Sequence, residues 1–164
     1  MAVSSWIPTV ISGVATSVSL LAFAYQVHRA RFNQSVDLLF RLENDFFGGE
    51  KVTQRALAAK NYLADAGDFA EMEDVLDFFE TVAMLTRKKA LNLFMVWHTF
   101  DYWMERYYAV AAPHIERKQS KSPGVWEDLQ WILPRLQRLE ARKGRTRLDD
   151  AELLRFMKEE SEEC

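Results

Sequence analysis

The sequence predicts an all-α protein with a single N-terminal transmembrane helix that continues into a cytoplasmic bundle of about four to five helices. Three observations indicate this class. Apolar residues recur at helical rather than alternating spacing, the 164 residues include only 6 glycines and 4 prolines, and an uncharged apolar run lies near the N-terminus. We expect an anchor over 1–28, a cytoplasmic helical bundle over 29–147, and a short helix with an acidic C-terminal tail over 148–164.

The run from Ile7 to Tyr25 contains nineteen residues without an acidic residue, lysine, arginine or histidine. At about 1.5 Å per residue, a helix of this length spans roughly 28 Å, which is close to the hydrocarbon thickness of a bilayer. Trp6 and Tyr25 stand at the two ends, where aromatic rings favour membrane interfaces. The alternative is an apolar core helix of a soluble bundle, although such a helix would normally carry charges on one face.

The basic residues near the run all follow it, and the first of them are Arg29, Arg31 and Arg41. The positive-inside rule therefore places the N-terminus outside and the C-terminus in the cytoplasm, as in a single-pass protein of the cytoplasmic (inner) membrane. A secretory signal peptide would carry its basic residues ahead of the apolar run. The run is thus interpreted as an anchor that is retained, with membrane lipid as a partner.

Small and hydroxyl-bearing residues form a stripe along this predicted helix, and most are separated by three or four positions. The stripe consists of Thr9, Ser12, Gly13, Thr16, Ser17 and Ser19. Gly13 and Ser17 have the small-xxx-small spacing that lets membrane helices approach closely. Two interpretations follow: the hydroxyls are merely tolerated because they bond back to their own helix, or the stripe mediates self-association as a homo-oligomer. In the second case it forms a seam between copies or lines a narrow polar pore.

The first helix is predicted to run beyond the membrane as far as the glycine pair at 48–49. Its apolar positions there are Phe32, Val36, Leu39, Leu42 and Phe46. A second helix is expected from about Glu50 to Ala64, followed by a loop over Asp65–Asp68. Asp68 and Glu71 have capping-box spacing, so Asp68 is predicted to cap the third helix, which ends in the basic residues 87–89.

The second half of the chain is predicted to contain an aromatic helix, a leucine-striped helix and a short acidic helix. The aromatic stretch occupies residues 91–114, and Ser122–Gly124 separates it from the next helix, which Pro134 should kink. The inward stripe of that helix comprises Trp126, Leu129, Leu133, Leu136 and Leu139. A last helix begins at about Asp149 and gives way to an acidic, frayed end.

Four stretches resemble a family of uncharacterised bacterial proteins that have one N-terminal membrane helix and a compact cytoplasmic helical domain. They are LENDFFGGEKVTQRA (Leu42–Ala56), VLDFFETVAMLTRKKALN (Val75–Asn92), VWHTFDYWMERYY (Val96–Tyr108) and PGVWEDL (Pro123–Leu129). The resemblance covers most of the chain. It implies a location and an architecture but no activity, because none of these stretches is a catalytic motif.

Composition and motifs exclude several classes of function. A net charge of −3 argues against a surface built for nucleic acid, and the single cysteine, Cys164, allows no intramolecular disulfide. The sequence has no phosphate-binding glycine loop and no nucleophile elbow. We therefore expect a protein that is not an enzyme, binds no cofactor or metal, and has no nucleic-acid partner.

One histidine has carboxylates nearby in sequence. His98 precedes Asp101 by three residues, and Glu105 follows four residues later, so a membrane-tethered hydrolase centred on these three is one alternative. The structural alternative places His98 within an aromatic core and pairs an acidic residue with an arginine. His114 follows Pro113, where a capping or surface role at a helix end is expected.

The most concentrated cation patch in the sequence lies late in the chain. It comprises Arg135, Arg138, Arg142, Lys143, Arg145 and Arg147. The ordinary interpretation is a solvated helix face near anionic headgroups, and the functional one is a site for an anionic small molecule such as a nucleotide-like signal.

These observations lead to two functional hypotheses ahead of the hydrolase. In the first, the protein is a membrane-anchored, non-enzymatic helical protein that acts by self-association and protein contacts at the cytoplasmic face. In the second, it is an oligomeric pore-forming or membrane-perturbing effector gated by an anionic signal.

Overall fold

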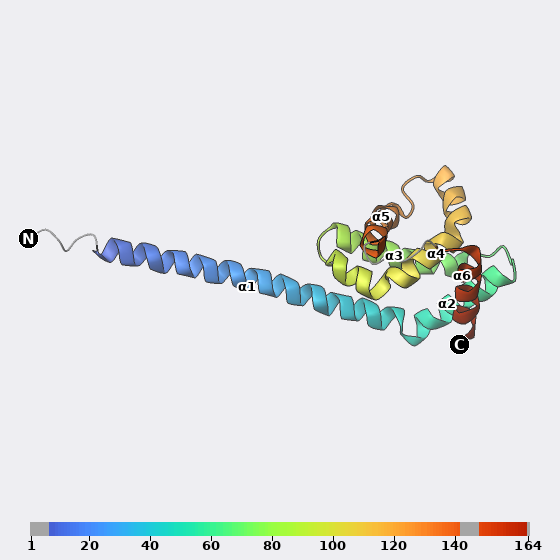
Figure 1. Ribbon diagram of the computed structural model, residues 1–164, viewed down its shortest axis with the longest axis horizontal. Helices are drawn as coiled ribbons and strands as arrows, with labels where there is room; N and C mark the ends of the chain where they lie inside the picture. Colours follow the sequence, from blue (N-terminus) through green and yellow to red (C-terminus); the bar gives the residue numbers. More distant parts are fainter. Residues whose placement is uncertain (1–6, 142–147, 164) are drawn as a thin grey trace, which may run out of the picture. The chain divides into compact units, whose positions relative to one another are not determined.

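In a computed structural model, the chain is described over residues 7–141 and 148–163, with side chains from residue 19 onward. These residues form helices and no strand, which confirms the all-α class (Figure 1). The helices are α1 (Ile7–Phe46), α2 (Gly49–Leu63), α3 (Ala70–Arg87), α4 (Leu93–Lys121), α5 (Glu127–Ala141) and α6 (Asp150–Glu162). Their order and approximate bounds follow the predicted elements.

The chain divides into two compact units, Met1–Asp37 and Leu38–Cys164. The first contains most of α1, and the second contains the end of α1 and the other five helices described. Among the described residues, no helix combines the length and the apolar character needed to cross a bilayer. Most of the uncharged run lies at residues 7–18, whose side chains are outside that description, so the membrane span remains a prediction.

The core of the second unit is formed where α3 and α4 meet the other helices. Completely buried side chains include Leu76, Phe79, Phe100, Met104, Leu129 and Leu136. Helix α5 packs mainly against α3, and α6 packs mainly against α2 (Figure 1). The helical stripes seen in the sequence therefore become the contact faces, since residues three and four apart share one side of a helix.

The predicted capping box at the start of α3 is wrong. Phe69 occupies the N-cap position and makes no side-chain cap, while Asp68 lies one residue earlier. The Asp68 carboxylate accepts a hydrogen bond from the Ala70 N–H at 3.1 Å, which is a local turn contact. Glu71 instead accepts a hydrogen bond from the Asn61 amide at 3.1 Å and thus joins α3 to α2.

The N–H groups at the start of α4 are capped by the residue just before the helix, and those at the start of α5 by a side chain of a neighbouring helix. Asn92 caps α4 by accepting the Phe94 N–H at 2.8 Å. The Glu80 carboxylate of α3 accepts the N–H groups of Asp128 and Leu129 in the first turn of α5, at 3.1 and 2.7 Å. This cross-helix cap fixes α5 against α3, because a helix N-terminus leaves N–H groups that need acceptors.

Helices α4 and α6 each extend further than the sequence indicated. α4 continues through Pro113 to Lys121, so His114 lies inside a helix rather than at its end. α6 is capped by Asp149, as predicted, through a 2.7 Å bond from the Glu152 N–H. It remains helical to Glu162 where a frayed end was expected.

Candidate functional site

Among the described residues of the second unit, two clusters of charged groups and aromatic rings are the candidates for a functional site. The first, which we call the buried cluster, consists of Arg55, Tyr107, Trp103, Glu160 and Glu163. Arg55 lies on α2 and is only 1% exposed. Its Nε and Nη2 donate to the two carboxylate oxygens of Glu160 at 2.8 and 3.1 Å, which is the two-point geometry that a guanidinium forms best.

The remaining groups of the buried cluster complete the hydrogen bonding of both ions. Arg55 also donates to the Phe46 carbonyl at 3.1 Å and to Glu163 at 2.6 Å. Glu160 accepts further bonds from the Tyr107 hydroxyl at 2.5 Å and the Trp103 indole at 3.3 Å. The Arg55 guanidinium lies 4.5 Å from the centre of the Phe46 ring, in cation–π contact.

Burial and these partners determine the protonation states. Burial raises the pKa of Tyr107 well above its ordinary value, and the adjacent Glu160 charge raises it further. Burial alone would lower the pKa of Arg55, but the bond and charge of Glu160 raise it overall. The cluster therefore holds the buried Arg55–Glu160 ion pair beside a neutral tyrosine, with Glu163 at its exposed edge, and we assign it a structural role that links α2, α4 and α6.

The second cluster, which we call the open cluster, lies where α3 faces the last turns of α4. It consists of Phe69, Glu73, His114, Arg117, Lys118 and Lys121. The Glu73 carboxylate bonds to His114 Nε2 at 2.7 Å and accepts from Lys118 Nζ at 2.8 Å to one oxygen and 3.0 Å to the other. Burial alone would raise the pKa of Glu73, but the bonds from Lys118 and His114 lower it, so Glu73 is ionised.

Aromatic stacking orders the open cluster. The Phe69 ring lies parallel to the His114 imidazole, with centroids 4.2 Å apart, and the Arg117 guanidinium lies 5.6 Å from the Phe69 ring centre. These residues, with Lys121 and the loop at Gly67 and Asp68, line a surface cavity of about 490 Å³. The three cations of this arrangement can hold an anion.

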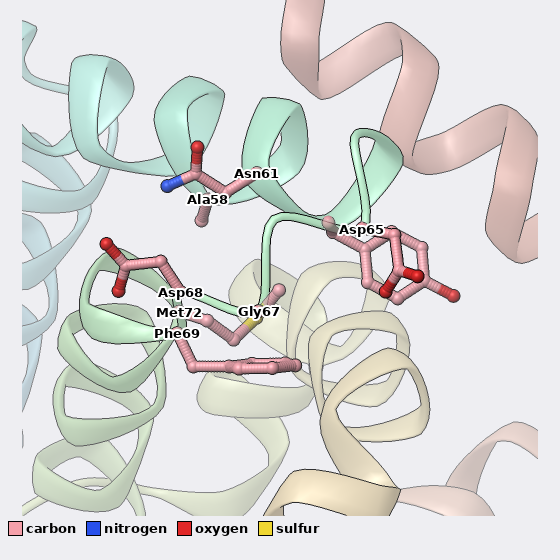
Figure 2. Close-up of a pocket in the computed structure, with 8 residues that line it drawn as sticks. Ala58, Asn61, Asp65, Gly67, Asp68, Phe69 and Met72 are labelled. Carbon is pink, nitrogen blue, oxygen red and sulfur yellow. The ribbon is translucent and has the colours of Figure 1, made fainter.

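A smaller cavity adjoins the open cluster on the other side of Phe69 (Figure 2). Figure 2 shows Ala58 and Asn61 of α2 on one side, and Phe69 and Met72 at the start of α3 on the other, with the loop through Gly67 between them. Its volume of about 80 Å³ has room for little more than water. The two cavities share Gly67, Asp68 and Phe69 in their walls.

The predicted cation patch is only partly described. Arg135 is half-buried, and its guanidinium lies 4.1 Å from the centre of the Trp131 ring and donates to the Trp131 carbonyl. Arg138 is exposed. The remaining members, Arg142, Lys143, Arg145 and Arg147, lie outside the described residues. An anion site on this patch remains a prediction.

The structure does not gather the residues proposed for a hydrolase. His98 is exposed rather than placed in an aromatic core, whereas Asp101 is buried, and Glu105 accepts a bond from Gln137 at 3.2 Å. Over the part of the chain that is described, no group of three His, Cys, Asp or Glu side chains is placed to hold a metal. The prediction that His98 lies within an aromatic core is therefore wrong.

Most side chains of the hydroxyl stripe on the first helix also lie outside the described part of the structure. The backbone of α1 is helical from Ile7, but of the stripe only Ser19 has a described side chain. Self-association through Thr9, Ser12, Gly13, Thr16 and Ser17 thus rests on the sequence alone.

Sequence reasoning missed both clusters. A signal for the open cluster exists, since His114, Arg117, Lys118 and Lys121 are spaced by three, one and three residues along one face of a helix. It was overlooked because Pro113 suggested a helix end. A signal for the buried cluster exists as well, since Glu160 lies on the same helical face as Phe156 and Met157, which are buried.

The described chain is thus that of an all-helical protein with a structural ion pair, an open cation-lined cavity and no metal-binding group among its described residues. Within this class, residues 9–135 match the model of the family described as Domain of unknown function (DUF4760), and the chain belongs to that family. This confirms the resemblance to an uncharacterised family, while the membrane helix and the bacterial source remain predictions. No curated protein and no solved structure matches the chain.

Proposed function

We propose that this protein is a non-enzymatic helical protein, anchored in the cytoplasmic membrane by residues 1–28, that acts by self-association and protein contacts at the cytoplasmic face. The observation that carries the proposal is the nineteen-residue uncharged run from Ile7 to Tyr25, which falls within the single continuous helix α1. The family match begins inside this run, at residue 9, so the run is part of the family's domain.

An exposed aromatic patch on the second unit supports the expectation of protein contacts. Phe47 and Tyr102 are 41% and 38% exposed, and both rings contact Trp103, with centroids 4.9 and 5.0 Å apart. Aromatic residues exposed together are typical of sites that bind other proteins, because they bury a large area at low entropic cost.

The anchor and the assembly are tested on the full-length protein. Cells are lysed and fractionated, the membrane fraction is extracted with detergent, and the mass of the extracted protein is measured by light scattering. The expected result is a membrane-bound protein with a mass of two or more chains. A protein found wholly in the soluble fraction as a monomer would overturn the proposal.

A matched pair of variants tests the seam. Gly13→Leu should shift the extracted protein toward the monomer, because close helix approach requires a small residue and such contacts contribute about 1–2 kcal/mol. Val14→Leu, which helical spacing places opposite the hydroxyl stripe, should leave the mass unchanged. If the oligomer also conducts ions, and Thr16→Leu with Ser19→Leu abolishes the current, the pore-forming function replaces this proposal.

A further inference from the structure

Two of the three cations in the open cluster, Arg117 and Lys121, have no acidic partner among the described residues. Arg117, Lys118 and Lys121 line the 490 Å³ cavity together with two acidic residues, Asp68 and Glu73. Glu73 is committed to His114 and Lys118, and Asp68 bonds to the Ala70 N–H. Among the described residues, no carboxylate lies within ion-pair distance of Arg117 or Lys121.

The chemistry of these cations favours one class of anion. A guanidinium presents a planar fork that matches the oxygens of a phosphate, and an ammonium adds a point charge beside it. The cavity of about 490 Å³ is within the size range of small-molecule sites and much larger than one phosphate requires. The Phe69 ring adds an apolar surface to its wall.

We propose that this cavity binds a phosphate ester, whose phosphoryl group is held by Arg117 and Lys121 and whose remaining part lies along Phe69. Lys118 adds a third cation from the next position on the same helix. The ester comes either from a soluble metabolite or from the headgroup of a lipid with a terminal phosphate. The proposal is independent of the membrane anchor and of self-association.

Glu73 tunes the site, because its negative charge opposes an incoming phosphate and occupies Lys118. Replacing it by glutamine removes the charge and frees Lys118 for the ligand. At the few ångströms involved, one charge near a protein surface changes a binding constant by about tenfold. The Glu73→Gln variant should therefore bind phosphate more tightly, whereas a damaged fold would bind it less tightly.

The test is isothermal titration calorimetry of the detergent-extracted full-length protein with inorganic pyrophosphate. The double variant R117Q/K121Q should weaken binding at least tenfold, since each charge-assisted contact to phosphate contributes on the order of a factor of ten. Lys158→Gln, at an exposed lysine on α6, controls for the loss of a positive charge away from the cavity and should alter affinity less than twofold. Glu73→Gln should strengthen binding severalfold to tenfold.

Three outcomes would overturn the proposal: no heat of binding for the wild type at millimolar pyrophosphate, an equal loss in Lys158→Gln and R117Q/K121Q, or weaker binding by Glu73→Gln. Adenosine monophosphate and dihexanoyl phosphatidic acid then separate the two sources of the ester. The source is soluble if the nucleotide binds more tightly and lipid if the phosphatidic acid does. None of these readouts depends on oligomeric mass or membrane partition, so this proposal and the proposed function fail separately.

Discussion

The buried and the open cluster use the same chemical parts for different ends. Each pairs a carboxylate with a cationic or imidazole group, and each stacks one such group on a phenylalanine ring: Arg55 on Phe46, and His114 on Phe69. They differ in exposure, since the Arg55 side chain is 2% exposed and that of Lys118 is 45% exposed. Burial makes the first a structural connection, while exposure leaves the second available to a ligand.

The two clusters also differ in how completely their charges are matched. In the buried cluster, both carboxylate oxygens of Glu160 accept bonds from Arg55, and Tyr107 and Trp103 add further donors. In the open cluster, Arg117 and Lys121 face the cavity without an acidic partner among the described residues. If this contrast is correct, substitutions in the buried cluster should reduce stability, and substitutions in the open cluster should change binding.

The largest expected effect is that of Arg55→Gln. This substitution leaves the Glu160 charge buried with only neutral donors, and breaking a buried ion pair in this way costs about 3–5 kcal/mol. The free energy of unfolding of the full-length protein in detergent, measured by urea titration with near-ultraviolet circular dichroism, should fall by that amount. Arg117→Gln should change it by less than about 0.5 kcal/mol. Equal effects would remove the distinction between the clusters.

Glu160→Gln should have the next largest effect. Glutamine keeps an acceptor for Tyr107 but loses the charge that compensates Arg55, for which we expect a loss of about 2–3 kcal/mol. Glu163 contacts the same guanidinium, but its side chain is 52% exposed, so Glu163→Gln should cost less than about 1 kcal/mol. The same urea titration compares Glu160→Gln with Glu163→Gln. A larger loss of stability for Glu163→Gln would mean that the exposed Glu163, rather than the buried Glu160, compensates the charge of Arg55.

Tyr107→Phe should cost about 1–2 kcal/mol, because it removes one hydrogen bond to the Glu160 carboxylate. Its pH dependence is more specific. The pKa of Tyr107 is raised on folding, so its contribution to stability is present below the ordinary tyrosine pKa of about 10 and is lost as the pH rises above it. The wild type should therefore lose stability between pH 9 and 11 more steeply than Tyr107→Phe, which thermal unfolding across that range measures.

The sequence predicted the elements better than the charges between them. Apolar spacing is a local property, and it located each described helix and the Asp149 cap of α6, although it missed the last turns of α4 and of α6. The partner of Arg55 lies 105 residues away, in an acidic stretch where four glutamates appear equivalent until the register of α6 is known. Pairing over such a separation is set by tertiary packing, which local patterns do not encode.

The error at the start of α3 has a similar cause. Asp68 and Glu71 have the spacing of a capping box, but Asn61 on α2 bonds to Glu71, and the helix begins one residue later than the pattern suggests. Glu71 bonds across to α2, whereas Asp68 accepts the local Ala70 N–H. The loop thereby places Phe69 against His114, so the start of α3 became part of the open cluster.

Glu73→Gln should have only a small effect on stability, although we expect the same substitution to strengthen phosphate binding. Its side chain is 30% exposed, so water screens its bonds and we expect a loss below about 1 kcal/mol at pH 7. Since folding lowers the pKa of Glu73, its contribution is present above the ordinary carboxyl value of 4.5 and disappears as the pH falls further. Thermal midpoints of the wild type and Glu73→Gln should therefore differ slightly at pH 7 and converge at pH 3. Glu159→Gln on α6, an exposed control, should show no such convergence, whereas a loss of several kcal/mol in Glu73→Gln would make the open cluster a second structural connection.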